Sequence, residues 1–241
     1  MGKPSVPIDP VADLKRRLTV TPAARQPACV HTWWGEHGFR LHPAAVGKRV
    51  AVALIEQQPL EVKQAGIVVL NELLGSQLRA ADLPAFARLF GDGHLADPAL
   101  VDRFIFKVLV TLVDRTAGRR EVARGLGLWR TAETVWQRRA ACLAFVKIAP
   151  RGEGALAGLT DIILTTCATV VWSHERGDQA AVGWVLRELS RAEPQRAEQF
   201  FRRHALLMSR ECARFAVVRF PPALRSELLA HHKRVTSLAP G

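Results

Sequence analysis

The chain has 241 residues, of which 49% are hydrophobic and 23% are charged, so it can bury a substantial core and is not an intrinsically disordered protein. Lysine and arginine number 34 against 22 acidic residues, and the formal net charge of +12 favours a polyanionic partner. An inert basic surface is the alternative that charge alone leaves open.

The first residues, MGKPSVPIDP, lack the apolar core of a secretory signal. No stretch approaches the roughly 20 apolar residues that a membrane-spanning helix needs. The cysteines are widely separated, without a C-x-x-C pair, which predicts small buried apolar residues rather than a zinc site or a disulfide framework: Cys29, Cys142, Cys167 and Cys212. We therefore expect an intracellular protein without a membrane partner.

Apolar residues recur at helical spacing along almost the whole chain. After Trp33 and Trp34, which we expect to anchor the N-terminal helices in the core, the periodicity predicts helices that end at glycine, proline or capping residues. These helices cover residues 42–58, 60–75, 80–90, 98–114, 120–129, 131–149, 156–172, 176–191, 194–207 and 209–220, with a last helix after Pro221 and Pro222.

The segment TTCATVV, residues 165–171, is the one ambiguous stretch, because its β-branched residues also suit a strand. Its length and its continuous apolar context favour a buried helix, and the predicted fold is all-α. Equivalent helices recur about every 35 to 45 residues, as in HEAT-like repeats, which favours a helical solenoid with a concave basic groove over a bundle. We expect one domain over residues 1–241, with flexible ends at 1–20 and 236–241.

Three predicted helices carry residues that a core does not need. Trp136 and Arg139 stand three residues apart in one helix, Trp184 and Arg187 repeat this spacing in another, and Asp114 ends a third. The alternatives are structural: a core Trp136, arginines that extend past the indoles to water, and an Asp114 that caps a segment or pairs with its neighbour. Periodicity and composition alone predict a basic helical binding protein.

The segments VWQRRAACL (135–143) and VGWVLRELSR (182–191), followed by Pro194 and LLMSRECARF (206–215), resemble the AlkD family of alkylpurine DNA glycosylases. The resemblance covers about residues 102–215, and the N-terminal hundred residues agree only in helical pattern. It implies HEAT-like repeats that remove N3- or N7-alkylated purines from DNA, through a catalytic aspartate at Asp114 and an active-site tryptophan at Trp184.

The same resemblance assigns Arg139 to the family's W-x-x-R helix, where it would grip a phosphate. We also expect Trp136, Arg187 and Lys147 to contact DNA. The sequence departs from the family at Val110, where a second tryptophan is usual one turn before the catalytic aspartate. A smaller side chain there suggests a site opened for bulky adducts, as in family members that protect antibiotic producers from their own alkylating agents.

The family resemblance implies a monofunctional alkylpurine DNA glycosylase that acts as a monomer on double-stranded DNA, with no cofactor and no metal. Such an enzyme is expected in the bacterial cytoplasm, associated with the nucleoid. Two alternatives stay open at this point. The first is a DNA-binding relative with little activity, because of Val110. The second is a HEAT-like scaffold that binds protein through its groove, the charge being incidental.

Overall fold

The computed structural model describes residues 9–115 and 118–238, and this part of the chain is helical throughout, with no strand. Short 3-10 turns join the helices and two π-helical segments continue them. The α-helices in chain order are α1 (Pro10–Val20), α2 (Gln26–Glu36), α3 (Ala44–Ile55), α4 (Leu60–Val68), α5 (Leu83–Gly91), α6 (Pro98–Phe104), α7 (Val110–Arg115), α8 (Arg119–Gly127), α9 (Val135–Leu143), α10 (Leu159–Val170), α11 (Arg176–Leu189), α12 (Pro194–His204), α13 (Arg210–Ala216) and α14 (Pro222–Ser237).

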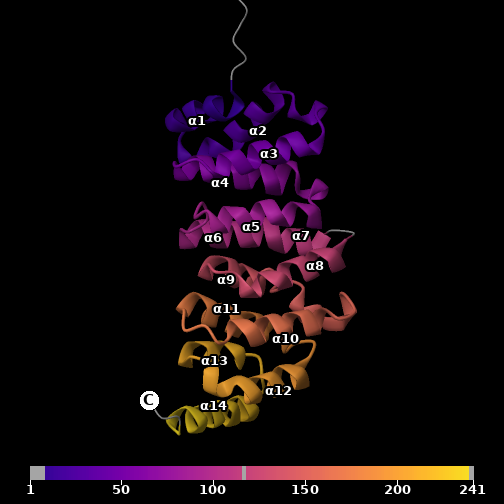
Figure 1. The fold of residues 1–241 in the computed structure, drawn as a ribbon, viewed down its shortest axis with the longest axis vertical. Coiled ribbons are helices and arrows are strands. Elements are labelled where there is room, and N and C mark those ends of the chain that lie inside the picture. The colour runs from indigo at the N-terminus through magenta and orange to yellow at the C-terminus, as the bar shows by residue number, and fades with distance from the viewer. Residues whose placement is uncertain (1–8, 116–117, 239–241) are drawn as a thin grey trace, which may run out of the picture.

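The helices stack in chain order into an elongated solenoid, from α1 and α2 at one end to α14 at the other (Figure 1). In its C-terminal half α11 packs between α9 and α13, while α8 packs on α10. Figure 1 shows α9, α11 and α13 one below another on the left, and α8, α10 and α12 on the right. The all-α solenoid predicted from the repeat spacing is confirmed. Helices that pack directly on one another, such as α9, α11 and α13, are therefore not consecutive in the sequence.

Short polar and proline signals set where the helices begin. The Asp97 side chain accepts a hydrogen bond of 2.8 Å from the backbone of Leu100, and Pro98 occupies the first turn of α6. Thr134 caps α9 and Ser209 caps α13 in the same way. The predicted starts at residues 98 and 209 are therefore close to those of α6 and α13. Helix α9 begins at Val135 rather than 131 and ends at Leu143 rather than 149, and α13 ends at Ala216 rather than 220.

The core runs as one cluster through the stack, and the two N-terminal tryptophans belong to it. Trp33 is fully buried, donating its indole N–H to the carbonyl of Pro10, and Trp34 is 3% exposed. Their predicted anchoring role is confirmed.

The ambiguous segment 165–171 lies in α10 and its end, with Cys167 and Val170 buried, so the helical interpretation is also confirmed. Cys29 is only half-buried, unlike the other three cysteines.

The N-terminal helix corrects the expectation of a flexible segment at 1–20. Residues 10–20 form α1, because Asp9 caps the helix and Leu14 and Leu18 bury their side chains in the core. The rest of that expectation, at residues 1–8, lies outside the described residues. At the other end α14 continues to Ser237, which shortens the expected tail, and residues 239–241 also lie outside the described part.

Two π-helical segments interrupt the regular helical spacing. Val69–Leu73 continues α4, and Ile105–Leu109 joins α6 to α7, so residues 98–115 form one continuous helical segment. A π turn inserts about one extra residue and rotates everything beyond it relative to a regular helix. The faces presented by α6 and α7 therefore differ from those that a 3.6-residue period predicts.

Helices α11 and α13 approach each other at Gly183. A Cβ atom at this position would lie 2.7 Å from the carbonyl oxygen of Cys212 and 2.9 Å from the Cβ of Phe215, both on α13. The absence of a side chain at Gly183 therefore sets the distance between the two helices. Since α11 carries Trp184, this close contact also fixes the height of the tryptophan in the stack.

We predict that Gly183→Ala destabilises the protein by about 1 to 3 kcal/mol, because neither the Cys212 carbonyl nor the α13 backbone can move without displacing the helix. Urea denaturation measures the loss. Gly35→Ala is the matched control, since a Cβ at Gly35 in α2 would meet nothing within 4 Å. Equal stability of the two variants would contradict the close packing of α11 on α13.

Candidate active site and nucleic-acid interface

Arg139 joins three helices through its guanidinium group. Its Nε donates to Oδ1 of Asp102 at 3.0 Å and its Nη2 to Oδ2 at 3.1 Å, a two-pronged pair between α9 and α6. Its Nη1 donates to the backbone carbonyl of Gly177 at 3.1 Å, in the first turn of α11. The Arg139 side chain is 14% exposed and that of Asp102 is 39% exposed. The carboxylate therefore faces solvent while the arginine behind it is fixed.

Trp184 lies beside a residue from the same helical segment as Asp102. The ring of Trp184 is 5.5 Å from that of Phe106, centroid to centroid, with the planes tilted by 46°. Phe106 follows Asp102 by four residues, about 6 Å along the helix, so the two side chains share one face. On this face Asp102 contacts Arg139 of α9, and Phe106 contacts Trp184 of α11.

The cation next to Trp184 is Arg187. Its guanidinium carbon lies 5.6 Å from the centroid of the indole, within the range of a cation–π contact. Both side chains are only half-buried. The tryptophan therefore stays accessible on one part of its surface although most of its neighbours on α11 are core residues, and the spacing of Trp184 and Arg187 in the sequence reflects a direct contact.

Asp114, the sequence-predicted catalytic residue, has other partners. Lys147 lies 2.9 Å from its Oδ2, and Arg151 pairs with its Oδ1. Lys147, and with it Arg151, holds the pKa of the Asp114 carboxyl below its ordinary value, against the raising effect of partial burial. Asp114 follows Asp102 by twelve residues, about 18 Å along the helix. The structure joins Asp114 to Lys147, whereas it joins Arg139 to Asp102.

Two further predicted residues, Val110 and Trp136, pack in or against the core. Val110 is 5% exposed and belongs to the core, so its small side chain does not widen the surface next to Trp184. Trp136 is half-buried and packs against the core, one turn before Arg139 on α9. Sequence reasoning missed Asp102 and Phe106. The signal for them was their four-residue spacing in the segment 98–114, where Asp102 interrupts a run of apolar residues.

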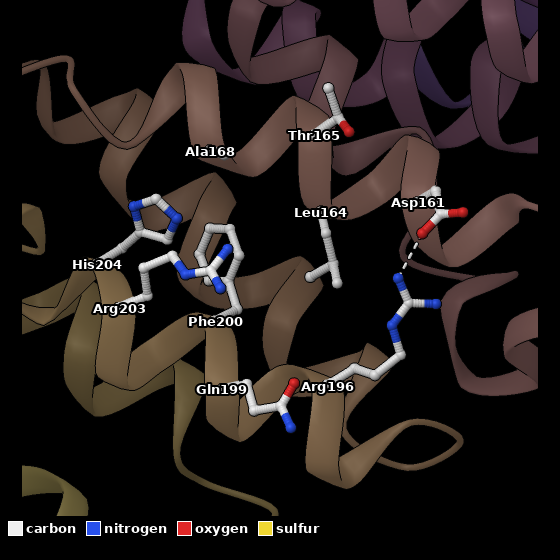
Figure 2. Close-up of a pocket in the computed structure, with 9 residues that line it drawn as sticks. All are labelled: Asp161, Leu164, Thr165, Ala168, Arg196, Gln199, Phe200, Arg203 and His204. Carbon is white, nitrogen blue, oxygen red and sulfur yellow. Dashed lines mark hydrogen bonds and ion pairs between the residues drawn. The ribbon is translucent and has the colours of Figure 1, made fainter.

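A separate cavity of about 290 Å³ lies between α10 and α12 (Figure 2). Arg196 pairs with Asp161 on one side of it, and the ring of His204 lies against that of Phe200, with centroids 4.4 Å apart and the planes tilted by 37°. Burial, and then the charge of Arg203, lowers the pKa of His204. This cavity shares no residue with the surroundings of Asp102 and Trp184, and we assign it no role in the reaction.

Comparison with known proteins shows the family of the chain. Residues 33–220 match the family model of the DNA alkylation repair enzymes, and the chain belongs to that family. Among solved structures it is similar to a predicted DNA alkylation repair enzyme from Enterococcus faecalis, with a TM-score of 0.66 and 18% identity over 88% of this chain and 92% of the other. That identity supports the fold alone. No curated protein matches the chain significantly.

Within residues 9–115 and 118–238, no group of three or more His, Cys, Asp or Glu side chains is arranged to hold a metal ion. In the same part of the chain, every helix is too short or too polar to cross a bilayer.

The depressed pKa of Asp114 predicts a pH-dependent contribution to stability. A carboxyl whose pKa is lowered on folding stabilises the native state above its unfolded pKa, near 3.8, and loses that contribution as pH falls through the folded pKa. Asp114→Asn should therefore unfold more easily than the wild type at pH 6, and the difference should shrink toward pH 3. Thermal unfolding across this range measures it. A difference independent of pH would contradict the ion pairs with Lys147 and Arg151.

Proposed function

We propose that the protein is a monofunctional DNA glycosylase that hydrolyses the N-glycosidic bond of N3- or N7-alkylated purines. The observation that carries the proposal is the group formed by Asp102, Arg139, Phe106 and Trp184. It combines a fixed, partly exposed carboxylate with an accessible aromatic face, and membership of the DNA alkylation repair enzymes is consistent with it.

The chemistry needs few protein groups because the substrate is already activated. An N3- or N7-alkylated purine is positively charged, and the electrons of the breaking bond to C1′ neutralise it, so no acid has to protonate the leaving base. The sugar becomes oxocarbenium-like as the bond breaks, as in glycoside hydrolysis. A water oxygen then bonds to C1′ and its proton passes to a carboxylate or to solvent.

We assign the carboxylate role to Asp102. Arg139 holds both of its oxygens in place, and each oxygen keeps a second lone pair for a water or for the sugar. A charge fixed in advance stabilises a developing cation without reorganisation. Asp114 is the alternative that the family resemblance supplied, but two cations already compensate its charge.

Trp184 and Phe106 form the aromatic side of the site. The face of an indole attracts a cation through its quadrupole, so Trp184 suits both the alkylated base and the developing charge on the sugar. Arg139 contributes by orientation, since three of its donors are engaged within the protein. Contacts to DNA phosphates would fall to exposed cations such as Lys147 and to the half-buried Arg187.

The central test is single-turnover base release from a duplex that contains one N7-methylguanine. Asp102→Asn should slow release by roughly a hundredfold or more, the usual effect of removing one preorganised charged group. Asp114→Asn, at the second carboxylate of the same helical segment, is the matched control and should reduce the rate far less. The reverse ranking would return the catalytic role to Asp114.

The same assay with a bulky N3-adenine adduct addresses substrate breadth. We propose that bulky adducts are accepted, because Trp184 is only half-buried and the Asp102 side chain is 39% exposed, so both can be reached from solvent. Release from the methylated duplex alone would restrict the enzyme to small lesions. The proposed role in antibiotic self-resistance requires that the bulky adduct be released.

Salt dependence separates a DNA enzyme from a protein scaffold. We predict that affinity for a 20-base-pair duplex falls by orders of magnitude between about 50 and 200 mM salt, as expected for six or more phosphate contacts. Fluorescence anisotropy with a labelled duplex measures it, with the protein monomeric in a parallel sedimentation run. Weak binding that does not respond to salt would favour the scaffold.

A further inference from the structure

Glu188 is a nearly buried carboxylate on α11 that the proposed reaction does not use. It is 6% exposed and lies between two arginines. Arg187 donates from Nε to Oε1 at 2.8 Å, and its Nη2 lies 2.7 Å from the same oxygen. Arg219, which follows α13, donates from Nη2 at 3.2 Å to each oxygen. One negative charge is therefore shared between two positive charges.

This cluster reaches the candidate site through Arg187. The same guanidinium that pairs with Glu188 lies 5.6 Å from the centroid of the Trp184 ring. A cation on an aromatic ring competes with a second cation for the same quadrupole, and it also repels that cation directly. An uncompensated Arg187 would therefore oppose a positively charged base next to Trp184, whereas an Arg187 neutralised by Glu188 would not.

We propose that Glu188 is a positioning residue that determines the charge selectivity of the site, by neutralising and orienting Arg187 so that Trp184 can bind a cationic purine. This inference rests on the proposed function, since it assumes that the alkylated base meets Trp184. Glu188 itself touches neither base nor sugar in this scheme. It acts through Arg187, and Arg219 limits its effect because it shares the same carboxylate.

The cost of burying Glu188 supports a role beyond packing. A carboxylate with 6% exposure is stable only with partners that compensate it, and a hydrophobic residue of similar size often serves stability equally well. At Glu188 the compensation comes from residues on either side of the α11–α13 contact. The arrangement fixes a defined local charge beside Trp184, which an apolar residue would not provide.

The experiment compares two duplexes that differ in the charge of one base. The first contains 2′-fluoro-N7-methyldeoxyguanosine, whose fluorine stabilises the glycosidic bond, at pH 6, where the base is cationic. The second contains 7-methyl-7-deazaguanine, a neutral base of the same shape. The ratio of the two dissociation constants is the charge preference of the protein, independent of catalysis.

We expect the wild type to prefer the cationic duplex, and Glu188→Gln to reduce this preference by roughly tenfold, the size of a cation–π contact, while binding the neutral duplex as before. Glu198→Gln, which removes an ion pair with Arg202 on α12, is the matched control and should leave the preference unchanged. Equal losses for both duplexes would show a merely structural role and overturn the inference.

Arg219→Gln provides a second, independent variant because its side chain is 39% exposed and its loss should not prevent folding. It leaves Glu188 to Arg187 alone, so the cationic preference should rise, and in the Glu188→Gln background it should restore part of the preference. An unchanged or lower preference in the single variant would overturn the inference, even where Glu188→Gln does not fold.

Base release from N7-methylguanine, measured separately, keeps the two proposals apart. A wild type that releases the base but shows no preference between the duplexes is a glycosylase to which Glu188 gives no charge selectivity. A wild type that prefers the cationic duplex but releases no base retains the charge selectivity and overturns the proposed reaction.

Discussion

The geometry of the candidate site depends on how the first turn of α11 is held. Three successive residues there are held by polar contacts. Arg139 donates to the carbonyl of Gly177, and Arg138 pairs with the carboxylate of Asp178 at 2.8 Å. The side chain of Gln179 makes four hydrogen bonds to the backbone of the segments before α11 and α13. Burial raises the pKa of Asp178, against the opposing effect of Ser173 and Arg138. Because these contacts are directional, they set the rotation of α11 and with it the position of Trp184.

The proposed function places two opposite electrostatic requirements on one surface. Binding to the negatively charged DNA backbone requires cations, and the chain has an excess of arginine and lysine over acidic residues. A cationic base instead requires that nearby positive charges be compensated. Around Trp184, Arg139 forms an ion pair with Asp102, and Arg187 forms one with Glu188. Pairing removes much of their repulsion while keeping their hydrogen bonds and packing. The site can then accept a positive charge within a protein that is strongly basic as a whole.

The helices were predictable because periodicity, caps and glycines all act within a few residues. The stretch 98–114 shows where this local reasoning ends. It contains two carboxylates, Asp102 and Asp114, and a regular helix of this length offers no reason to prefer one. The π-helical segment Ile105–Leu109 rotates the second half relative to the first, so Asp114 meets Lys147 while Asp102 meets Arg139. Val110 turns into the core for the same reason.

The sequence by itself determined the helices, the burial of Trp33 and Trp34, and the pairing of Trp184 with Arg187, because each follows from residues at most a few turns apart. It also determined the solenoid, through the recurrence of equivalent helices. Tertiary structure alone decided which carboxylate stands beside Arg139, that Phe106 lies on Trp184, and that Glu188 shares its charge between Arg187 and Arg219. Apart from the adjacent pair Arg187 and Glu188, these contacts join residues about 30 to 80 positions apart. Their partners are set by the stacking of whole helices, which no local pattern records.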